Sequence, residues 1–439
     1  MRRMLLISYL FPPMGGIGVQ RALSLAKYLP NSGFDVHVLK ASNAGGPVYD
    51  AALLRQVPAA VRVHSAFTPE VPFAVRQKLW SRLAGGKASK PANGAAPAPP
   101  RFSLKRPLIR AIKRVLCPEP EILWAPFALR KARAIIRREN IDCVLVTVPP
   151  FSALVIGTAL KRQFPGLKLI SDFRDEWLSF YLKDFEFQNS DYTRARAEQI
   201  EREAIEASDL VVAVNESSRD VIRARYPEQP DGKFAVLPNG YDPEAFAGFQ
   251  ARSHGTPRMV VTHVGTVYKT ASPRFYLDAL DGMPEAIRGS IETRFVGRIA
   301  ESEREIVENR LSPVKALGFM PQAEALKNME ETDYLLLTMT NDISVPGKLF
   351  EYMASGKPIL AIAAADSEVG RILHASKAGL CAPPDNPIAI QAMIMRAWEA
   401  RRDGKPLVST DINAVRQYER PQLARRYARI IQELEPCGG

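Results

Sequence analysis

Cysteine and long apolar runs are both scarce in this sequence, and each shortage excludes a class of protein. The four cysteines, Cys117, Cys143, Cys381 and Cys437, form no CxxC pair and have no metal-ligand spacing. This argues against a disulfide framework and a zinc site, and it fits a reducing compartment. No apolar run approaches the roughly 20 residues that span a bilayer. We therefore expect a cytoplasmic globular protein that binds no metal.

Acidic residues are too few to balance the basic ones, which leaves a net charge of +12. Much of the excess lies between residues 101 and 139. Such a patch fits nucleic acid, an anionic membrane surface or anionic substrates. No base-readout motif accompanies it, which argues against nucleic acid as a partner. Residues 105–116 have the pattern of a basic amphipathic helix, with Leu108 and Ile112 on its apolar face. This helix either lies on an anionic membrane or docks on its own domain.

Short apolar strands alternate with helical segments in two successive runs, with a break near residue 245. Such alternation predicts an α/β fold of two doubly wound parallel sheets. An Ala/Pro/Gly-rich stretch at 84–100 has too few large apolar residues to build a core, which predicts a flexible loop. The first predicted run of strands is 4–10, 34–39, 61–64, 141–148, 167–171, 210–214 and 234–237, and the second is 259–265, 293–297, 314–318, 334–338, 358–362 and 379–382. Ligands of such folds bind beyond the carboxyl ends of the strands.

A glycine-rich turn follows the first strand. The segment Phe11-Pro-Pro-Met-Gly-Gly-Ile-Gly-Val-Gln-Arg21 leads from that strand into a helix. Glycines in such a turn let the backbone bend and let a ligand approach, and the N–H groups at a helix start favour an anion. The segment lacks the third Gly or Ala of the dinucleotide fingerprint. An ordinary strand-to-helix turn therefore remains an alternative.

Taken in order, the strand-end motifs resemble one family, the retaining glycosyltransferases of family 4 (group 1), which have the GT-B fold. The motifs are the glycine turn, Ser171-Asp-Phe-Arg-Asp-Glu-Trp177, Leu237-Pro-Asn-Gly-Tyr-Asp242, Val264-Gly-Thr266, Leu317-Gly-Phe-Met-Pro-Gln-Ala-Glu-Ala-Leu326 and Val345-Pro-Gly-Lys-Leu-Phe-Glu-Tyr-Met-Ala-Ser-Gly-Lys-Pro358. The resemblance implies two Rossmann-like domains facing a central cleft. It assigns residues 1–243 to an acceptor-side domain and 244–414 to a nucleotide-sugar-binding domain. Residues 415–439 would form a helix that crosses back to the first domain.

The resemblance also implies a set of site residues. Glu351 would bind the nucleotide ribose and Lys348 would lie near the diphosphate, three residues away on the same helix. Arg174 and Asp175 are the expected catalytic residues, without a metal. The expected donor-binding residues are Gly15, Gly16, Gly265, Thr266, Lys269, Phe319, Lys348, Leu349 and Glu351.

Two positions depart from the family pattern. Many relatives carry a second glutamate eight positions before Glu351, where this chain has Ile343, with Asn341 and Asp342 nearby. At Val264-Gly-Thr266, relatives often have Gly-Arg, followed several residues on by a Lys. Lys269 is then the preferred phosphate ligand, with Arg274 and Arg298 as alternatives.

The predicted reaction is sugar transfer from a nucleotide-diphosphate sugar to an acceptor hydroxyl, with retention at the anomeric carbon. The donor is the only small molecule required, and no cofactor is expected. The basic patch favours a saccharide or lipid-linked saccharide acceptor, used in cell-surface polysaccharide or glycolipid assembly. The protein would then be peripheral on the inner face of the cytoplasmic membrane. A nucleotide-sugar epimerase on the same fold and a non-catalytic binding or scaffold subunit remain alternatives, the second because of Ile343.

Overall fold

The computed structural model describes residues 2–45, 49–69, 114–181, 190–252 and 255–434. By its internal contacts the chain divides into two compact units. The first comprises Met1–Val214, Ser218–Leu237 and Ala424–Gly439, and the second comprises Asn215–Ser217 and Pro238–Leu423. These divisions lie at 237/238 and 423/424, whereas the domain boundaries predicted from the sequence lie at 243/244 and 414/415. The predicted loop at 84–100 and residues 105–113 of the predicted basic helix lie outside the described residues.

The first unit is built on a parallel sheet, which has seven strands among the described residues, in the order β3-β2-β1-β4-β5-β6-β7. Its central strands are apolar and almost fully buried, as in a sheet that is covered on both faces. The strands are β1 (Arg2–Ile7), β2 (Phe34–Ala41), β3 (Arg62–Ala66), β4 (Cys143–Val148), β5 (Lys168–Phe173), β6 (Leu210–Ala213) and β7 (Phe234–Val236).

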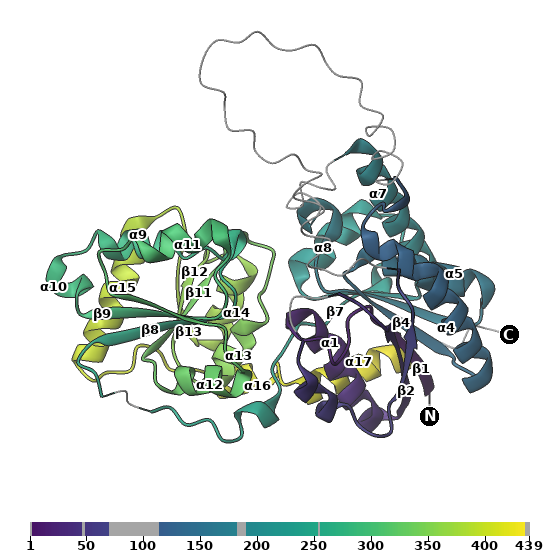
Figure 1. The fold of residues 1–439 in the computed structure, drawn as a ribbon, viewed down its shortest axis with the longest axis horizontal. Helices are drawn as coiled ribbons and strands as arrows, with labels where there is room; N and C mark the ends of the chain where they lie inside the picture. The colour runs from purple at the N-terminus through teal and green to yellow at the C-terminus, as the bar shows by residue number, and fades with distance from the viewer. Residues whose placement is uncertain (1, 46–48, 70–113, 182–189, 253–254, 435–439) are drawn as a thin grey trace, which may run out of the picture. The chain divides into compact units, whose positions relative to one another are not determined.

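Helices cover both faces of this first sheet. Figure 1 shows α4, α5 and α7 on one face, and α1 and α17 on the other. The apolar stripe predicted for the first helix is buried as expected, with Val19, Ala22 and Ala26 fully enclosed. The helices are α1 (Ile17–Tyr28), α4 (Ala125–Glu139), α5 (Leu154–Gln163), α7 (Asp191–Ala207), α8 (Glu216–Arg225) and α17 (Arg420–Glu433), with a short π-helical turn, η5 (Trp177–Tyr181), after β5.

The second unit is built on another parallel sheet, which has six strands within the described ranges, in the order β10-β9-β8-β11-β12-β13. The strands are β8 (Met259–Val264), β9 (Ile291–Val296), β10 (Val314–Gly318), β11 (Tyr334–Thr338), β12 (Ile359–Ile362) and β13 (Gly379–Ala382). The helices are α9 (Arg274–Asp281), α10 (Glu285–Arg288), α11 (Glu301–Glu308), α12 (Gln322–Glu330), α13 (Lys348–Ser355), α14 (Glu368–Ser376), α15 (Pro387–Arg402) and α16 (Ile412–Arg416).

Two hydrophobic cores lie on the opposite faces of this second sheet. Alternate residues of β11 separate between them: Leu336 belongs to the core with α9 and α15, and Leu335 and Leu337 belong to the core with α13 and α14. This is the two-residue alternation of a strand that is buried on both faces. The apolar runs in the sequence therefore mark a central strand, and the turns that follow them mark the edge where side chains become available to a ligand.

The predicted α/β architecture of two parallel sheets is confirmed, and each predicted strand is found. The first strand, predicted over 4–10, ends earlier, at Ile7. Tyr9, which lies beyond this end, is buried in a loop, where its ring packs edge-on against Trp124 with the ring centroids 5.3 Å apart. Apolar character beyond Ile7 therefore reflects burial without sheet pairing. Over the described part of the chain, no helix is both long and apolar enough to cross a bilayer.

Candidate functional site

The carboxyl ends of β8, β9 and β10 surround a hollow of about 130 Å³ in the second unit. Its lining brings together three predicted donor-binding residues, Gly265, Thr266 and Phe319, with Phe319 as a largely exposed aromatic ring. The full lining is Val264, Gly265, Thr266, Val296, Gly297, Arg298, Phe319, Met320 and Ala325. Arg298, which the sequence offered only as an alternative phosphate ligand, lies in this set, and Lys269 does not.

Two glycines shape the floor of this hollow. Gly265 and Gly297 have φ angles of 128° and 140°, a backbone region that side chains disfavour. A Cβ atom on Gly297 would lie 2.3 Å from the carbonyl oxygen of Gly265, and one on Gly265 would lie 3.0 Å from Nζ of Lys348. Both positions therefore need glycine, and together they bring the two strand ends and Lys348 close to one another.

Lys348, the first residue of α13, is held by a histidine that the sequence analysis did not single out. Its Nζ lies 3.0 Å from Nε2 of His263, and Nδ1 of His263 lies 3.1 Å from the carbonyl oxygen of Leu336. Burial, and then the charge of Lys348, hold the pKa of His263 well below its ordinary value. The ring is therefore neutral. It donates from Nδ1 to Leu336 and accepts from the Lys348 ammonium at Nε2.

The charge of Lys348 is itself weakened by its surroundings. Burial lowers the pKa of Lys348 to about 8, and the nearby charge of Glu351 only partly opposes this. Burial also raises the pKa of Glu351, against the opposing charges of Arg420 and Lys348. A partly buried ammonium is stabilised by a nearby negative charge, such as that of a phosphate. At the start of α13, burial therefore weakens the charged forms of both Lys348 and Glu351.

Leu349, a predicted donor-binding residue, is part of a hydrophobic core. Its side chain is fully buried in the core with α13, and its backbone N–H donates to Pro346 at 3.0 Å. Both groups that could bind a donor are thus already used. Leu349 anchors α13, which keeps its neighbour Lys348 in place.

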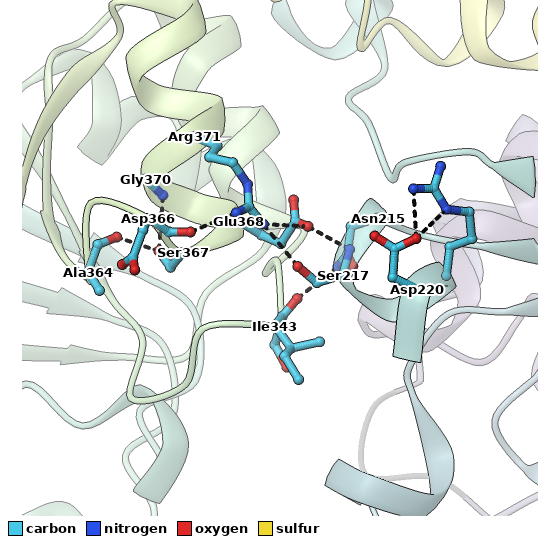
Figure 2. Close-up of polar contacts among 12 residues, drawn as sticks. Asn215, Ser217, Asp220, Ile343, Ala364, Asp366, Ser367, Glu368, Gly370 and Arg371 are labelled. Carbon is cyan, nitrogen blue, oxygen red and sulfur yellow. Dashed lines mark hydrogen bonds and ion pairs between the residues drawn. The ribbon is translucent and has the colours of Figure 1, made fainter. Parts of the chain in front are cut away.

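The loop before α13 contains Ile343, where the resemblance led us to look for a glutamate. Oδ1 of Asn341 accepts from the N–H groups of Ile343 and Ser344, at 3.2 and 2.7 Å. The carbonyl oxygen of Ile343 accepts from Nδ2 of Asn215 at 2.8 Å, which Figure 2 shows. The loop is therefore fixed through its backbone, and the apolar Ile343 side chain supplies no carboxylate.

The segment 215–217 belongs to this second unit through further contacts. The N–H of Ser217 donates to Oε1 of Glu368 at 2.8 Å, and Nη2 of Arg371 donates to the hydroxyl of Ser217 at 2.9 Å (Figure 2). Arg371 also pairs with Glu368 at 2.9 Å. These contacts give Glu368 and Arg371, at the start of α14, a structural use.

In the first unit, Gly15 and Gly16 lie directly before α1 as predicted. Gly16 is the N-cap of α1 with a φ of 90°, and no side chain caps the helix. A Cβ atom at Gly16 would meet nothing within 4 Å. The glycine is thus required by its backbone angle and not by a neighbouring atom.

Arg174 is predicted to be catalytic, and its guanidinium donates hydrogen bonds to backbone carbonyl oxygens. Its Nε donates to Val148 at 3.0 Å, and its two terminal nitrogens donate to the carbonyl oxygens of Gly18 and Pro149. These bonds tie the ends of β4 and β5 to the start of α1. Asp175, its predicted partner, is half-buried, and burial raises its pKa while the charge of Arg174 opposes this. The geometry gives Arg174 a structural use, and its catalytic role stays a prediction.

A second arginine completes the same framework. Arg21 of α1 makes a buried bidentate ion pair with Asp172, with its Nε 2.8 Å from Oδ2 and its Nη2 2.6 Å from Oδ1. Thr147 donates to Asp172 at 2.8 Å, and Arg21 also donates to the carbonyl oxygen of Leu237 at 2.9 Å. Of the motif Asp172–Trp177, the first carboxylate therefore holds the fold together, because it is fully paired and buried.

Comparisons with known proteins agree with the resemblance. The family model described as Glycosyltransferase Family 4 matches residues 92–245, and the model described as Glycosyl transferases group 1 matches residues 258–400, so that the two together span more than half of the chain. The probable glycosyltransferase WbjE of Pseudomonas aeruginosa is 28% identical over 102 residues, which are 22% of this chain and 26% of that protein. The chain thus covers about a quarter of the length of this curated relative.

Solved structures match over nearly the whole chain. Anabaena Alr3699/HepE, solved in complex with UDP and glucose, is 16% identical with a TM-score of 0.60, covering 99% of this chain and 100% of that one. The lipopolysaccharide outer core galactosyltransferase WaaB is 11% identical with a TM-score of 0.60, covering 98% of this chain and 99% of that one. At these identities, the likeness shows the fold.

Proposed function

This chain belongs to glycosyltransferase family 4 (group 1) and has the GT-B fold, and from that premise we propose that it transfers a hexose from a nucleotide-diphosphate sugar to an acceptor hydroxyl. The observation that carries the proposal is the Lys348–His263 pair beside the hollow at the ends of β8, β9 and β10. A partly buried ammonium next to glycine backbone and an exposed aromatic ring is suited to a diphosphate joined to a nucleobase. HepE, with the same fold, was solved with UDP.

Within this proposal, each donor residue has a distinct role. Lys348 neutralises the diphosphate, whose oxygens approach Gly265 and Thr266 in the lining of the hollow. The N–H of Gly265 is not available to them, because it donates to the carbonyl oxygen of Val296 at 2.8 Å. Phe319 flanks the nucleobase. Glu351 accepts the ribose hydroxyls, which a carboxylate can do in a bidentate manner. Lys269 is exposed and does not line the hollow.

The chemical step then needs stabilisation of the leaving diphosphate. Positive charge and fixed N–H dipoles aimed at the departing oxygens lower the barrier, and they need no rearrangement during the reaction. Lys348 supplies the charge, and a bound diphosphate would raise its lowered pKa. We expect retention at the anomeric carbon, with the leaving diphosphate taking the acceptor proton, and we expect activity without an added metal.

For the acceptor, we propose a saccharide or lipid-linked saccharide in cell-surface polysaccharide or glycolipid assembly. WaaB, which has the same fold, is described as a lipopolysaccharide outer core galactosyltransferase. The first unit supplies the acceptor contacts in this proposal, and Gly15 and Gly16 at the start of α1 add an anion-binding position. We place the protein in the cytoplasm.

The test combines donor binding with turnover. UDP, GDP and ADP are compared by thermal shift, because a ligand at one hundred times its Kd stabilises the folded state by about 2.7 kcal/mol. The responding nucleotide sugar is then incubated with and without candidate acceptors, and the released nucleoside diphosphate is measured. Acceptor-dependent release supports transfer, whereas conversion of the donor without an acceptor supports an epimerase. If none of the nucleotides shifts the unfolding transition, the proposal fails.

Matched variants make the binding result specific. Lys348→Met keeps the volume of the side chain but removes its charge, and it should abolish most of the nucleotide shift. Lys327→Met on α12 changes an exposed lysine of the same unit and should leave the shift unchanged. Equal losses in both variants would contradict the placement of the diphosphate at Lys348.

Ile343 favours a second candidate function, a non-catalytic binding subunit. The loop 341–344 is held by its backbone contacts and carries no carboxylate at position 343. Such a protein would bind the donor without turnover over a broad acceptor screen. Ile343→Glu would then be the informative variant, since a gain of turnover would show that the missing carboxylate limits catalysis.

A further inference from the structure

Helix α4 presents a basic face that the proposed reaction does not use. Its small and branched apolar side chains, Ala128, Ala132, Ile135 and Ile136, are buried against the sheet of the first unit. Basic side chains recur on the opposite face at helical spacing. We define the α4 surface as Phe67, Phe127, Arg130, Lys131, Arg137 and Arg138, all of them exposed. The helix lies on the outside of its unit (Figure 1).

An exposed aromatic pair lies at the beginning of this surface. Phe127 in the first turn of α4 and Phe67 just after β3 pack edge-on, with their ring centroids 5.4 Å apart. Both rings remain open to solvent, at 43% and 53% exposure. The two rings contact each other and still face water, so they form a small apolar platform next to positive charge.

Little negative charge opposes the basic side chains of this face. Glu139, the last residue of α4, pairs with Arg138 and with Arg62, both at 2.7 Å. Arg137 lies over the ring of Phe164 at 5.7 Å. Among the described residues, no carboxylate lies within ion-pair distance of Arg130 or Lys131. Arg130 and Lys131 therefore leave the α4 surface with positive charge that no carboxylate in the described part of the chain pairs with.

We propose that the α4 surface docks on an anionic lipid bilayer. The two ingredients of interfacial binding are present side by side: aromatic rings that enter the boundary of headgroups and acyl chains, and basic side chains that meet lipid phosphates. A nucleic acid would bind the positive charge, but it would not explain the Phe67–Phe127 pair. These rings pack against each other, whereas base stacking needs open ring faces. An acidic protein partner is the other occupant that the test must exclude.

This surface is distinct from the basic helix predicted at 105–116, most of which lies outside the described residues. It goes beyond the proposed function, since a transferase with a water-soluble acceptor would not need it. It would bring the first unit to the membrane on which a lipid-linked saccharide resides. Binding to vesicles is measured without donor or acceptor, so failure of this proposal and failure of the proposed reaction are separate results.

The experiment is flotation of the full chain with two kinds of vesicle. One contains phosphatidylcholine alone, and the other contains phosphatidylcholine with about 30% of the anionic lipid phosphatidylglycerol. We expect partition onto the anionic vesicles only, and its loss in high salt because the attraction is screened. The double variant Arg130→Glu/Lys131→Glu should weaken partition by roughly 30-fold or more, at about fivefold for each basic residue removed. Phe127→Ser should weaken it without changing the net charge.

A matched control separates this face from the overall charge of +12. Arg425→Glu/Arg426→Glu reverses two exposed basic residues on α17, in the same unit, and should leave partition nearly unchanged. Circular dichroism checks that each variant is folded. Equal losses in the two double variants would overturn the proposal, since binding would then follow net charge alone. Absence of wild-type binding to the anionic vesicles would overturn it as well, and would leave an acidic protein as the occupant.

Discussion

The side-chain nitrogen of Lys348 lies 3.0 Å from Nε2 of His263, a neutral ring that is fixed on its other side by the carbonyl oxygen of Leu336. Lys348 thus stands at the start of α13 with its ammonium directed by β8. Because burial lowers the pKa of Lys348 to about 8, its charge is only partly present in mildly alkaline solution. Several measurable consequences depend on this one contact.

Nucleotide affinity should fall as the pH rises from 7 to 9. The free protein loses the Lys348 proton as the pH passes about 8, whereas a bound diphosphate raises the pKa of Lys348, so that binding takes up a proton. We expect the Kd for UDP, measured by calorimetry, to rise by about tenfold over this range. Lys348→Arg keeps its charge at every pH in question and should flatten the dependence. A wild-type Kd that is constant from pH 7 to 9 would contradict this account.

His263 should act on the nucleotide through Lys348, as a positioning residue. Asparagine in its place can retain the bond to Leu336 but cannot reach Nζ of Lys348, whereas glutamine can place an oxygen near the position of Nε2. We expect His263→Asn to weaken UDP binding by about tenfold, the loss of one hydrogen bond to a charged group, and His263→Gln to recover part of it.

The two His263 variants have their own control. Both remove a buried ring, so both should lower the unfolding temperature by similar amounts. If UDP affinity tracks the unfolding temperature and does not distinguish Asn from Gln, His263 is only a packing residue.

The strands could be predicted from the sequence because their signal is local. Leu335, Leu336 and Leu337 are apolar because both faces of the second sheet are covered, so the residue types alone predict that this strand is buried. His263 could not be identified in the same way. In the sequence it reads as one polar residue in a buried strand, and only the position of α13 reveals its partner.

Arg174 shows a different limit of the sequence. The segment Asp172–Trp177 is correctly placed at a strand end, where ligands of this fold bind. A motif gives the position of an arginine but not the direction of its N–H groups, and here three backbone carbonyls accept them. Leu349 and Lys269 lie outside the lining of the hollow for a related reason, since the side chain of Leu349 packs inward and Lys269 is an exposed residue of the turn η9 (Lys269–Ala271).

Three glycines near the hollow should respond differently to alanine. In Gly297→Ala the new Cβ would lie 2.3 Å from a backbone oxygen, which cannot move aside easily, so the unfolding temperature should fall most. In Gly265→Ala the new atom meets the flexible end of Lys348, so UDP affinity should fall more than stability does. Gly318→Ala, at a φ of 75° with open space around it, measures the cost of the backbone angle alone, roughly 1–3 kcal/mol. Equal thermal losses in all three would contradict the steric assignment.

Replacing Arg174 should cost stability before it costs chemistry. Arg174→Met removes the side-chain donor of three carbonyl oxygens, although Val148 keeps the backbone N–H of residue 174, and we expect a loss of about 2 kcal/mol in the free energy of unfolding, measured in urea. Asp175→Asn is the companion variant, because a half-buried carboxylate with a raised pKa gives up little stability when its charge is removed. Unchanged stability of Arg174→Met, together with lost transfer, would restore the catalytic interpretation of Arg174.

The last prediction concerns a buried carboxylate beside η5. Oε1 of Glu201 accepts from Nε and Nη2 of Arg225 at 3.0 and 2.8 Å and from the hydroxyl of Tyr226 at 3.0 Å, while its Oε2 is buried with no partner among the described residues. Burial raises the pKa of Glu201 to about 7, although Arg225 opposes the shift. The folded protein therefore holds a proton that the unfolded chain releases near pH 4.5. This contribution to stability is complete below about pH 4.5 and is lost as the pH rises through 7, by up to about 3 kcal/mol.

Urea unfolding of the wild type and of Glu201→Gln at pH 5 and pH 8 tests this, since the difference between the two proteins isolates Glu201 from other titrating groups. The wild type should lose more stability than the variant on going to pH 8, and an equal loss in both would show that Glu201 is already ionised in the folded protein at pH 5.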